Sequence, residues 1–444
     1  MSRWANLGHD PFAQEQANED TDEDAIELRS LDISTTEPTS SKATSDETQT
    51  HYVYEPLSTS QHQTRLIRLW RATSYPWVLD EDIDFGCTID TFQFKSAPSY
   101  VALSYTWGSP APTHAIVING KHYSVGDNLY NFLATFSKNG MDGRFMWVDQ
   151  ICIDQTNTRE RNEQVRRMAS IYLKSHHVVA WLDRSAHTAA TGLRDIRGPN
   201  FKSLHSFLGN RYFSRLWIIQ ELLLAQDAYF ICCEVWLRWN DIKEAIALIG
   251  PIHFDRLPNS KWLFLTEWDY DPTKRVVSRS QPRLSLRDCL LRYAGNECAD
   301  PRDKIYGLLG LLKKHIGLPS VDYDKSLQEV FIDTAQCLLD NEVREDYDFT
   351  LSCAAWDIIN LSRKMRLPKE DTKAVENMFK YIGNLPEVGE LGLQKPVRSD
   401  SNCWWYVFAE EEYYFVGDGL FLDMPRRFHV VTIPPHDSVT REQE

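Results

Sequence analysis

The chain has 444 residues, 42% of them hydrophobic, which is sufficient for two or three domains with buried cores. Its formal net charge of −15 argues against non-specific binding to nucleic acid or to anionic membranes, because both need a basic protein surface. No apolar run is long enough to span a bilayer, and the first residues lack the apolar stretch of a signal peptide, so we expect a cytoplasmic protein.

Residues 1–52 are rich in acidic residues, Ser and Thr. Such a segment cannot bury enough apolar surface to offset the entropy lost on ordering, so we expect a disordered tail. The following region, residues 53–250, alternates short apolar strands with amphipathic helices. Strands are predicted at residues 65–69, 100–104, 145–148, 177–182 and 229–233, and helices at residues 126–138, 157–174, 201–208, 215–225 and 241–249.

Two of these elements have a particularly clear pattern. Residues 100–104 are almost wholly apolar, as expected of a strand that is covered on both faces. The helix at 157–174 follows Asn157, which can cap it, and Glu160 stands where it can complete a capping box. The repeated strand–helix units predict an α/β fold, with a mostly parallel sheet and helices on both faces.

The rest of the chain has a different composition. Residues 251–283 are irregular and rich in Pro, Asp and Arg, which predicts a linker. Residues 284–444 are predicted to form a mainly helical C-terminal extension, with helices at 284–312 and 326–341 and one or two strands within 404–427.

Common catalytic motifs are missing. The sequence has no Walker A loop, no GxGxxG, no HExxH and no GxSxG elbow. Its 13 His and nine Cys show no metal-ligand spacing, so we expect reduced structural thiols, no bound metal and no cofactor.

Three other segments have a distinctive sequence, and they follow one another along the chain. They are YVALSYTWG at residues 100–108, WVDQICIDQ at 147–155 with the helix that follows it, and YFSRLWIIQE at 212–221. Together they resemble the fungal heterokaryon incompatibility (HET) domain, with its core at residues 100–225 of the 53–250 region. The resemblance implies an effector of fungal non-self recognition and programmed cell death, with a homo-oligomer or a HET-partner protein as its partner.

HET domains also have a remote resemblance to TIR domains, which have a flavodoxin-like α/β fold. Many TIR domains cleave NAD at the bond between nicotinamide and ribose, and their catalytic Glu often follows a Trp by four residues. Trp217 and Glu221 have that spacing here. The resemblance therefore implies Glu221 as the catalytic residue and NAD as a substrate.

The chemistry is feasible for these residue types. A separation of four places Trp217 and Glu221 on one face of a helix. NAD cleavage passes through an oxocarbenium-like sugar, whose positive charge a nearby carboxylate stabilises. The leaving nicotinamide needs no proton, because its departure neutralises the ring. One carboxylate can therefore suffice.

Ligands of open α/β sheets bind beyond the carboxyl ends of the strands. Substrate-binding candidates at two such ends are Ser104, Tyr105, Trp107, Gly108, Asp149 and Gln150. Tyr105 or Trp107 can stack on nicotinamide or adenine, and Gly108 permits close backbone approach. Arg215 can meet a phosphate, and Trp217 adjoins the proposed catalytic carboxylate.

Structural interpretations compete with these roles. Trp107 and Trp147 can be core residues, and Asp149 and Asp154 can cap the turns that follow them.

Arg215 and Glu221 can form a structural ion pair, which would leave the site inert. The same surface would then serve a non-enzymatic signalling module that assembles through homotypic or partner contacts.

Overall fold

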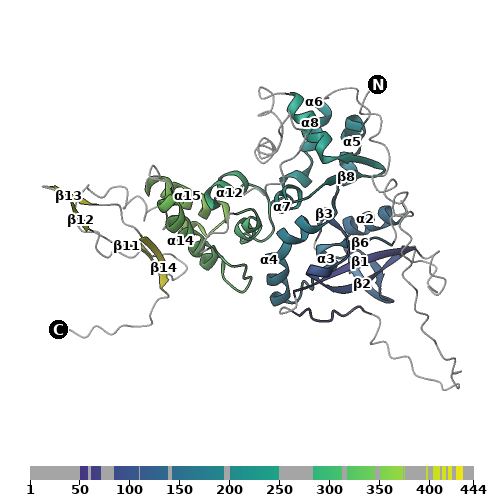
Figure 1. Ribbon diagram of the computed structural model, residues 1–444, viewed down its shortest axis with the longest axis horizontal. Coiled ribbons are helices and arrows are strands. Elements are labelled where there is room, and N and C mark those ends of the chain that lie inside the picture. Colours follow the sequence, from purple (N-terminus) through teal and green to yellow (C-terminus); the bar gives the residue numbers. More distant parts are fainter. Residues whose placement is uncertain are drawn as a thin grey trace, which may run out of the picture. The chain divides into compact units, whose positions relative to one another are not determined.

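The computed structural model describes 51–58, 62–71, 85–109, 111–138, 143–194, 201–249, 284–312, 318–345, 351–373, 375 and the strands at 397–398, 404–410, 413–416, 419–422 and 427–433. The chain divides into two compact units (Figure 1). Unit 1 comprises Met1–Cys152, His176–Asn210 and Asp227–Leu257, and unit 2 comprises Ile153–Ser175, Arg211–Gln226 and Pro258–Glu444. The predicted tail at 1–52 and linker at 251–283 lie outside the described residues, except for His51 and Tyr52.

Unit 1 contains a nine-stranded sheet with the strand order β5-β4-β2-β1-β6-β3-β7-β8-β9. Its strands are β1 (Gln63–Arg71), β2 (Phe85–Gln93), β3 (Val101–Tyr105), β4 (His114–Ile118), β5 (Lys121–Val125), β6 (Phe145–Trp147), β7 (His177–Trp181), β8 (Ala228–Cys232) and β9 (Val235–Arg238). Every residue of β3 and β7 is buried, which confirms that β3 is a central strand covered on both faces.

The sheet is mixed, whereas the sequence predicted a mostly parallel one. The centre, β6-β3-β7-β8, is parallel throughout, as repeated strand–helix units require. Outside it, β1 pairs antiparallel with both β2 and β6, and the hairpins β4–β5 and β8–β9 add further antiparallel edges. In the β4–β5 and β8–β9 hairpins, two-residue turns take the place of crossover helices, so these strands reverse direction.

Helices of unit 1 contact strands on both sides of the parallel centre of the sheet. Helix α2 (Asp127–Lys138) contacts β1 and β4 through an apolar face, while α8 (Trp239–Ile249) contacts β8 and β9. Helices α5 (His187–Arg194) and α6 (Phe201–Leu208) pack on each other. The short helix α3 (Asp149–Cys152) follows β6 directly and places Asp149 at the carboxyl end of that strand.

Unit 2 includes α4 (Thr158–Lys174), the helix with the clearest sequence signal. Asn157 caps it as predicted, because its Oδ1 accepts from the backbone N–H of Glu160 at 3.1 Å. The Glu160 carboxylate accepts from the backbone N–H of Asp154 at 2.8 Å, where a capping box would use Asn157. The Glu160 side chain thus stabilises the turn before the helix, and the Asn157 side chain caps the first turn.

The remaining elements of unit 2 are η6 (Arg211–Ser214), α7 (Ile218–Leu223), α12 (Leu286–Tyr293), α13 (Asp303–Tyr306), η7 (Leu309–Leu311), α14 (Leu327–Glu345) and α15 (Leu351–Lys364). Strands β10 (Val397–Arg398), β11 (Trp404–Glu410), β12 (Tyr413–Val416), β13 (Gly419–Leu422) and β14 (Arg427–Ile433) follow. The extension therefore consists of helices up to α15, and the elements β10 to β14 that follow are strands. Among the described helices, none combines the length and the apolar character needed to cross a membrane.

Candidate functional site

The carboxyl ends of β3, β6 and β7 meet at one edge of the sheet, because these neighbouring strands are parallel. Polar and aromatic side chains gather there from the segments that follow β3 and β6 and from the start of α2. We call this group the strand-end cluster; it consists of Tyr105, Trp107, Asn128, Asp149, Gln150 and Trp181.

Trp107 is the exposed aromatic residue of the strand-end cluster, with 40% of its surface accessible. Its indole N–H donates to Oδ2 of Asp149 at 2.7 Å. The second oxygen, Oδ1, accepts from the backbone N–H of Gln150 at 2.7 Å, so Asp149 also caps its own turn. The carboxylate thereby fixes the indole while the ring remains open to solvent, which rules out a core role for Trp107.

Asn128 connects the loop after β3 to the neighbouring strand. Its amide donates to the carbonyl oxygen of Thr106 at 2.6 Å, and its Oδ1 accepts from the indole N–H of Trp181 at 2.9 Å. Trp181 is buried at the end of β7. The sequence analysis missed Asn128 because its partners are distant in sequence and leave no local pattern.

The other predicted residues of this edge are placed differently. Ser104 and Tyr105 are buried within β3, and the Tyr105 hydroxyl donates to Oε1 of Gln150 at 2.9 Å. Gly108 is exposed and has a φ of +80°, a conformation that favours glycine. Its role in this structure is to turn the chain after Trp107.

Two residues with competing interpretations have structural roles. Trp147 is fully buried at the end of β6, as a core residue would be. Asp154 forms a local turn, since its Oδ1 accepts from the backbone N–H and the hydroxyl of Thr156 at 3.0 and 2.6 Å.

The predicted catalytic residue Glu221 lies in unit 2, on α7. Its backbone N–H donates to the carbonyl oxygen of Trp217 at 3.3 Å, which places the two residues one helical turn apart, as their spacing predicted. Glu221 is only 2% exposed, and one carboxylate oxygen lies 3.7 Å from Nη1 of Arg215. The ion pair that the sequence left open is therefore present.

Trp217 contacts a second buried carboxylate in unit 2. Its indole N–H donates to Oδ2 of Asp303 at 3.2 Å, and the Tyr323 hydroxyl donates to Oδ1 of Asp303 at 2.6 Å. Burial raises the pKa of Asp303 to about 6, although both hydrogen bonds act in the opposite direction. The guanidinium of Arg161 covers the Tyr323 ring at 3.8 Å from its centre. Trp217 is thus a partner of Asp303, which the sequence analysis did not select.

The predicted site residues fall into two groups. Tyr105, Trp107, Asp149 and Gln150 are brought together in unit 1 by hydrogen bonds. The remaining group, Arg215, Trp217 and Glu221, is held in unit 2 by the ion pair and the first turn of α7.

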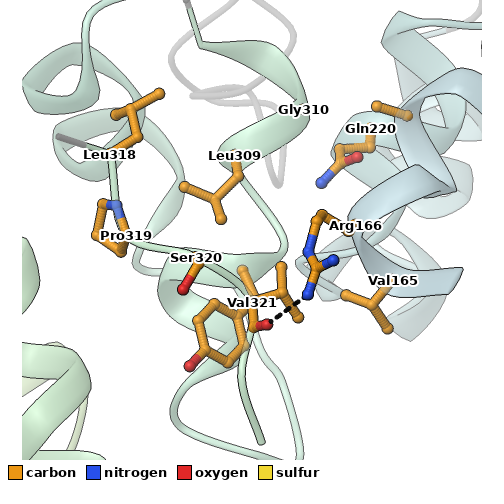
Figure 2. A pocket seen from close by; sticks show the side chains of 11 residues that line it. Val165, Arg166, Gln220, Leu309, Gly310, Leu318, Pro319, Ser320 and Val321 are labelled. Atoms are coloured by element: carbon orange, nitrogen blue, oxygen red, sulfur yellow. Dashed lines mark hydrogen bonds between the residues drawn. The ribbon is translucent and has the colours of Figure 1, made fainter. Parts of the chain in front are cut away.

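A cavity of about 250 Å³ also lies within unit 2, between α4, α7, η7 and residues 318–321 (Figure 2). The guanidinium of Arg166 donates to the carbonyl oxygen of Val321 at 3.3 Å, and the amide of Gln220 donates to the carbonyl oxygen of Gly307. None of the predicted site residues lines this cavity. Because these two polar groups are already engaged, we assign it no ligand.

Comparison with known proteins identifies the family of the domain that contains the strand-end cluster. The family model of heterokaryon incompatibility proteins (HET) matches residues 100–206. The chain contains a HET domain. The match covers the strand-end cluster and α4, and it ends before Arg215, Trp217 and Glu221.

Two curated fungal proteins are similar to this chain. Heterokaryon incompatibility protein 6, OR allele, of Neurospora crassa is 25% identical over 374 residues, which is 65% of this chain and 54% of the relative. Vegetative incompatibility protein HET-E-1 of Podospora anserina is 31% identical over 142 residues, or 31% of this chain and 10% of the relative. The chain thus spans about half of the first relative and a small part of the second. No solved structure was found to match it.

Proposed function

We propose that this HET domain protein is an effector of fungal incompatibility, which acts in the cytosol and triggers cell death in non-self recognition. The HET family match and the two relatives named for incompatibility support this role. We propose further that its domain is TIR-like and acts by hydrolysing NAD at the nicotinamide–ribose bond. The parallel centre of the sheet, β6-β3-β7-β8, is compatible with such a fold.

The observation that carries the ligand-binding part is the indole of Trp107. It is 40% exposed at the carboxyl edge of parallel strands, where open α/β sheets bind their ligands. The 2.7 Å bond from its N–H to Asp149 fixes the ring before a ligand arrives. A preorganised aromatic face reduces the entropy lost when nicotinamide or adenine stacks on it.

The proposed reaction breaks the bond between the ribose C1′ and the pyridinium nitrogen. Nicotinamide leaves as a neutral molecule with the bonding electron pair, and the ribose becomes an oxocarbenium-like cation. Water then adds to C1′ and loses a proton, giving ADP-ribose. We assign Glu221 the stabilisation of the cation, because of its carboxylate and its position one turn after Trp217.

Nicotinamide release from NAD by the purified full chain tests the proposal. We expect Trp107→Ala to raise the KM for NAD and Glu221→Gln to abolish turnover, with both variants folded by circular dichroism. Phe201→Ala is the matched control for the aromatic change, since Phe201 is similarly exposed at 37% and belongs to α6. Release that is unchanged in Glu221→Gln would contradict the catalytic assignment.

The ion pair between Arg215 and Glu221 favours a second candidate function. A buried carboxylate that balances a guanidinium serves the fold, and the domain would then signal by assembling with its own copies or with a partner protein. A folded chain that associates in light-scattering measurements, kills cells on expression and leaves NAD intact would support this alternative.

A further inference from the structure

We propose that His187, Cys233 and Glu234 form a Zn²⁺ site on the surface of unit 1. We call these three residues the hairpin triad, because Cys233 and Glu234 make up the turn between β8 and β9. His187 is the first residue of α5. Their potential ligand atoms all lie within 4.8 Å of one another.

The geometry of the hairpin triad suits a small cation. Nε2 of His187 lies 3.0 Å from a carboxylate oxygen of Glu234, at hydrogen-bond distance, so a bound ion would replace this contact with a bond to each side chain. His187 and Cys233 are half-buried and Glu234 is exposed, which leaves the site open to an ion from solvent. A water molecule can supply the fourth ligand of a tetrahedral ion.

The donor types favour zinc. An imidazole nitrogen, a thiolate sulfur and a carboxylate oxygen are all established Zn²⁺ ligands, whereas Mg²⁺ and Ca²⁺ prefer oxygen donors alone.

The backbone of the hairpin gives an independent reason to assign a role to Cys233. This residue has a φ of +54°. The hairpin β4–β5 of the same sheet has Asn119 and Gly120 in its two-residue turn, with φ values of +50° and +78°. Asn and Gly tolerate such angles, whereas Cys lacks this tolerance. A strained residue that persists where Gly would fit points to a function for its side chain.

The adjacent Cys232 provides an internal contrast. Its thiol is buried and donates to the carbonyl oxygen of Asp183 at 3.2 Å. The proposed site therefore uses only one of the two neighbouring thiols.

The sequence analysis expected no metal site because it searched for short ligand spacings. The ligands of the hairpin triad come from α5 and from a turn that follows β8, far apart in sequence. Only the packing of α5 against β9 brings them together.

Co²⁺ titration of the metal-free full chain tests the site, because thiolate ligation gives cobalt a charge-transfer absorption in the near ultraviolet. We expect this band to saturate at one equivalent and to disappear when Zn²⁺ is added. Cys233→Gly should remove the band and raise thermal stability, since Gly fits the backbone angle. His187→Ala should weaken Co²⁺ binding more than about tenfold, because even outer partners of metal ligands contribute about 10–100-fold.

Two variants serve as controls. Cys232→Ser and Cys298→Ser should keep the band, since Cys232 is engaged with Asp183 and Cys298 belongs to unit 2. A chain that shows no thiolate band at saturating Co²⁺, or a band that survives in Cys233→Gly, would overturn the proposal.

Discussion

Replacing Glu221 with Gln tests how much the ion pair with Arg215 contributes to the stability of the fold. The change keeps the size of the side chain and removes its charge. Glu221 is 2% exposed, and the Arg215 side chain is 16% exposed at 3.7 Å, so water screens the pair only weakly. Removing one partner of a fully buried pair costs roughly 3–5 kcal/mol. The pair has no hydrogen-bond contact at 3.7 Å and Arg215 is partly exposed, so we expect Glu221→Gln to cost about 1–2 kcal/mol.

A double-mutant cycle isolates this interaction. Urea unfolding of the parent chain, Glu221→Gln, Arg215→Met and the double variant gives four free energies of unfolding. We expect a coupling energy of about 1 kcal/mol, with the double variant less destabilised than the sum of the single changes.

The opposite sign would refute this reasoning. If Glu221→Gln raises the free energy of unfolding, or if the coupling energy is zero, the ion pair does not support the fold.

Three further predictions concern packing, pH and positioning. Gly310→Ala should destabilise by about 1–3 kcal/mol in urea unfolding, because its Cβ would lie 2.4 Å from that of Ala169 on α4; Gly295→Ala, whose Cβ would meet only a flexible lysine, should cost less. Burial raises the pKa of Asp303 from 3.8 to about 6, so the folded state holds this proton more tightly and the resulting stability is lost as pH rises between about 4 and 6. The shift corresponds to up to about 3 kcal/mol of pH-dependent unfolding free energy. We expect Asp303→Asn to reduce this pH dependence. If the unfolding free energies of the variant and the parent chain vary with pH in parallel, the assignment to Asp303 is wrong. Asn128→Ala should destabilise by about 1–3 kcal/mol, because the buried indole N–H that it accepts from loses its partner, and thermal unfolding with no change would refute this role.

Local patterns predicted the centre of the fold well. The apolar run at 100–104 became β3, and the amphipathic run after Asn157 became α4, because burial on both faces and a capped stripe are properties of neighbouring residues. The dipeptide Asn119–Gly120 was a usable hairpin signal for β4 and β5 that the analysis overlooked. The β8–β9 turn, formed by Cys233 and Glu234, contained no such signal.

The candidate site was harder to predict, because its partners come from distant parts of the chain. The Trp107–Asp149 and Trp217–Asp303 hydrogen bonds join residues 42 and 86 positions apart. Residue type suggested that Trp107 could stack on a ligand. Only the folded chain shows that Asp149 accepts a hydrogen bond from the indole of Trp107 and that Asp303 accepts one from the indole of Trp217.

The most direct test of the proposed function is the cellular NAD level after induced expression in a fungal host. We expect NAD to fall before viability does in cells that express the parent chain. Cells that express Glu221→Gln at the same level, with the protein folded, should keep both NAD and viability. Death of the cells with NAD unchanged would contradict the proposed hydrolysis and favour signalling by assembly.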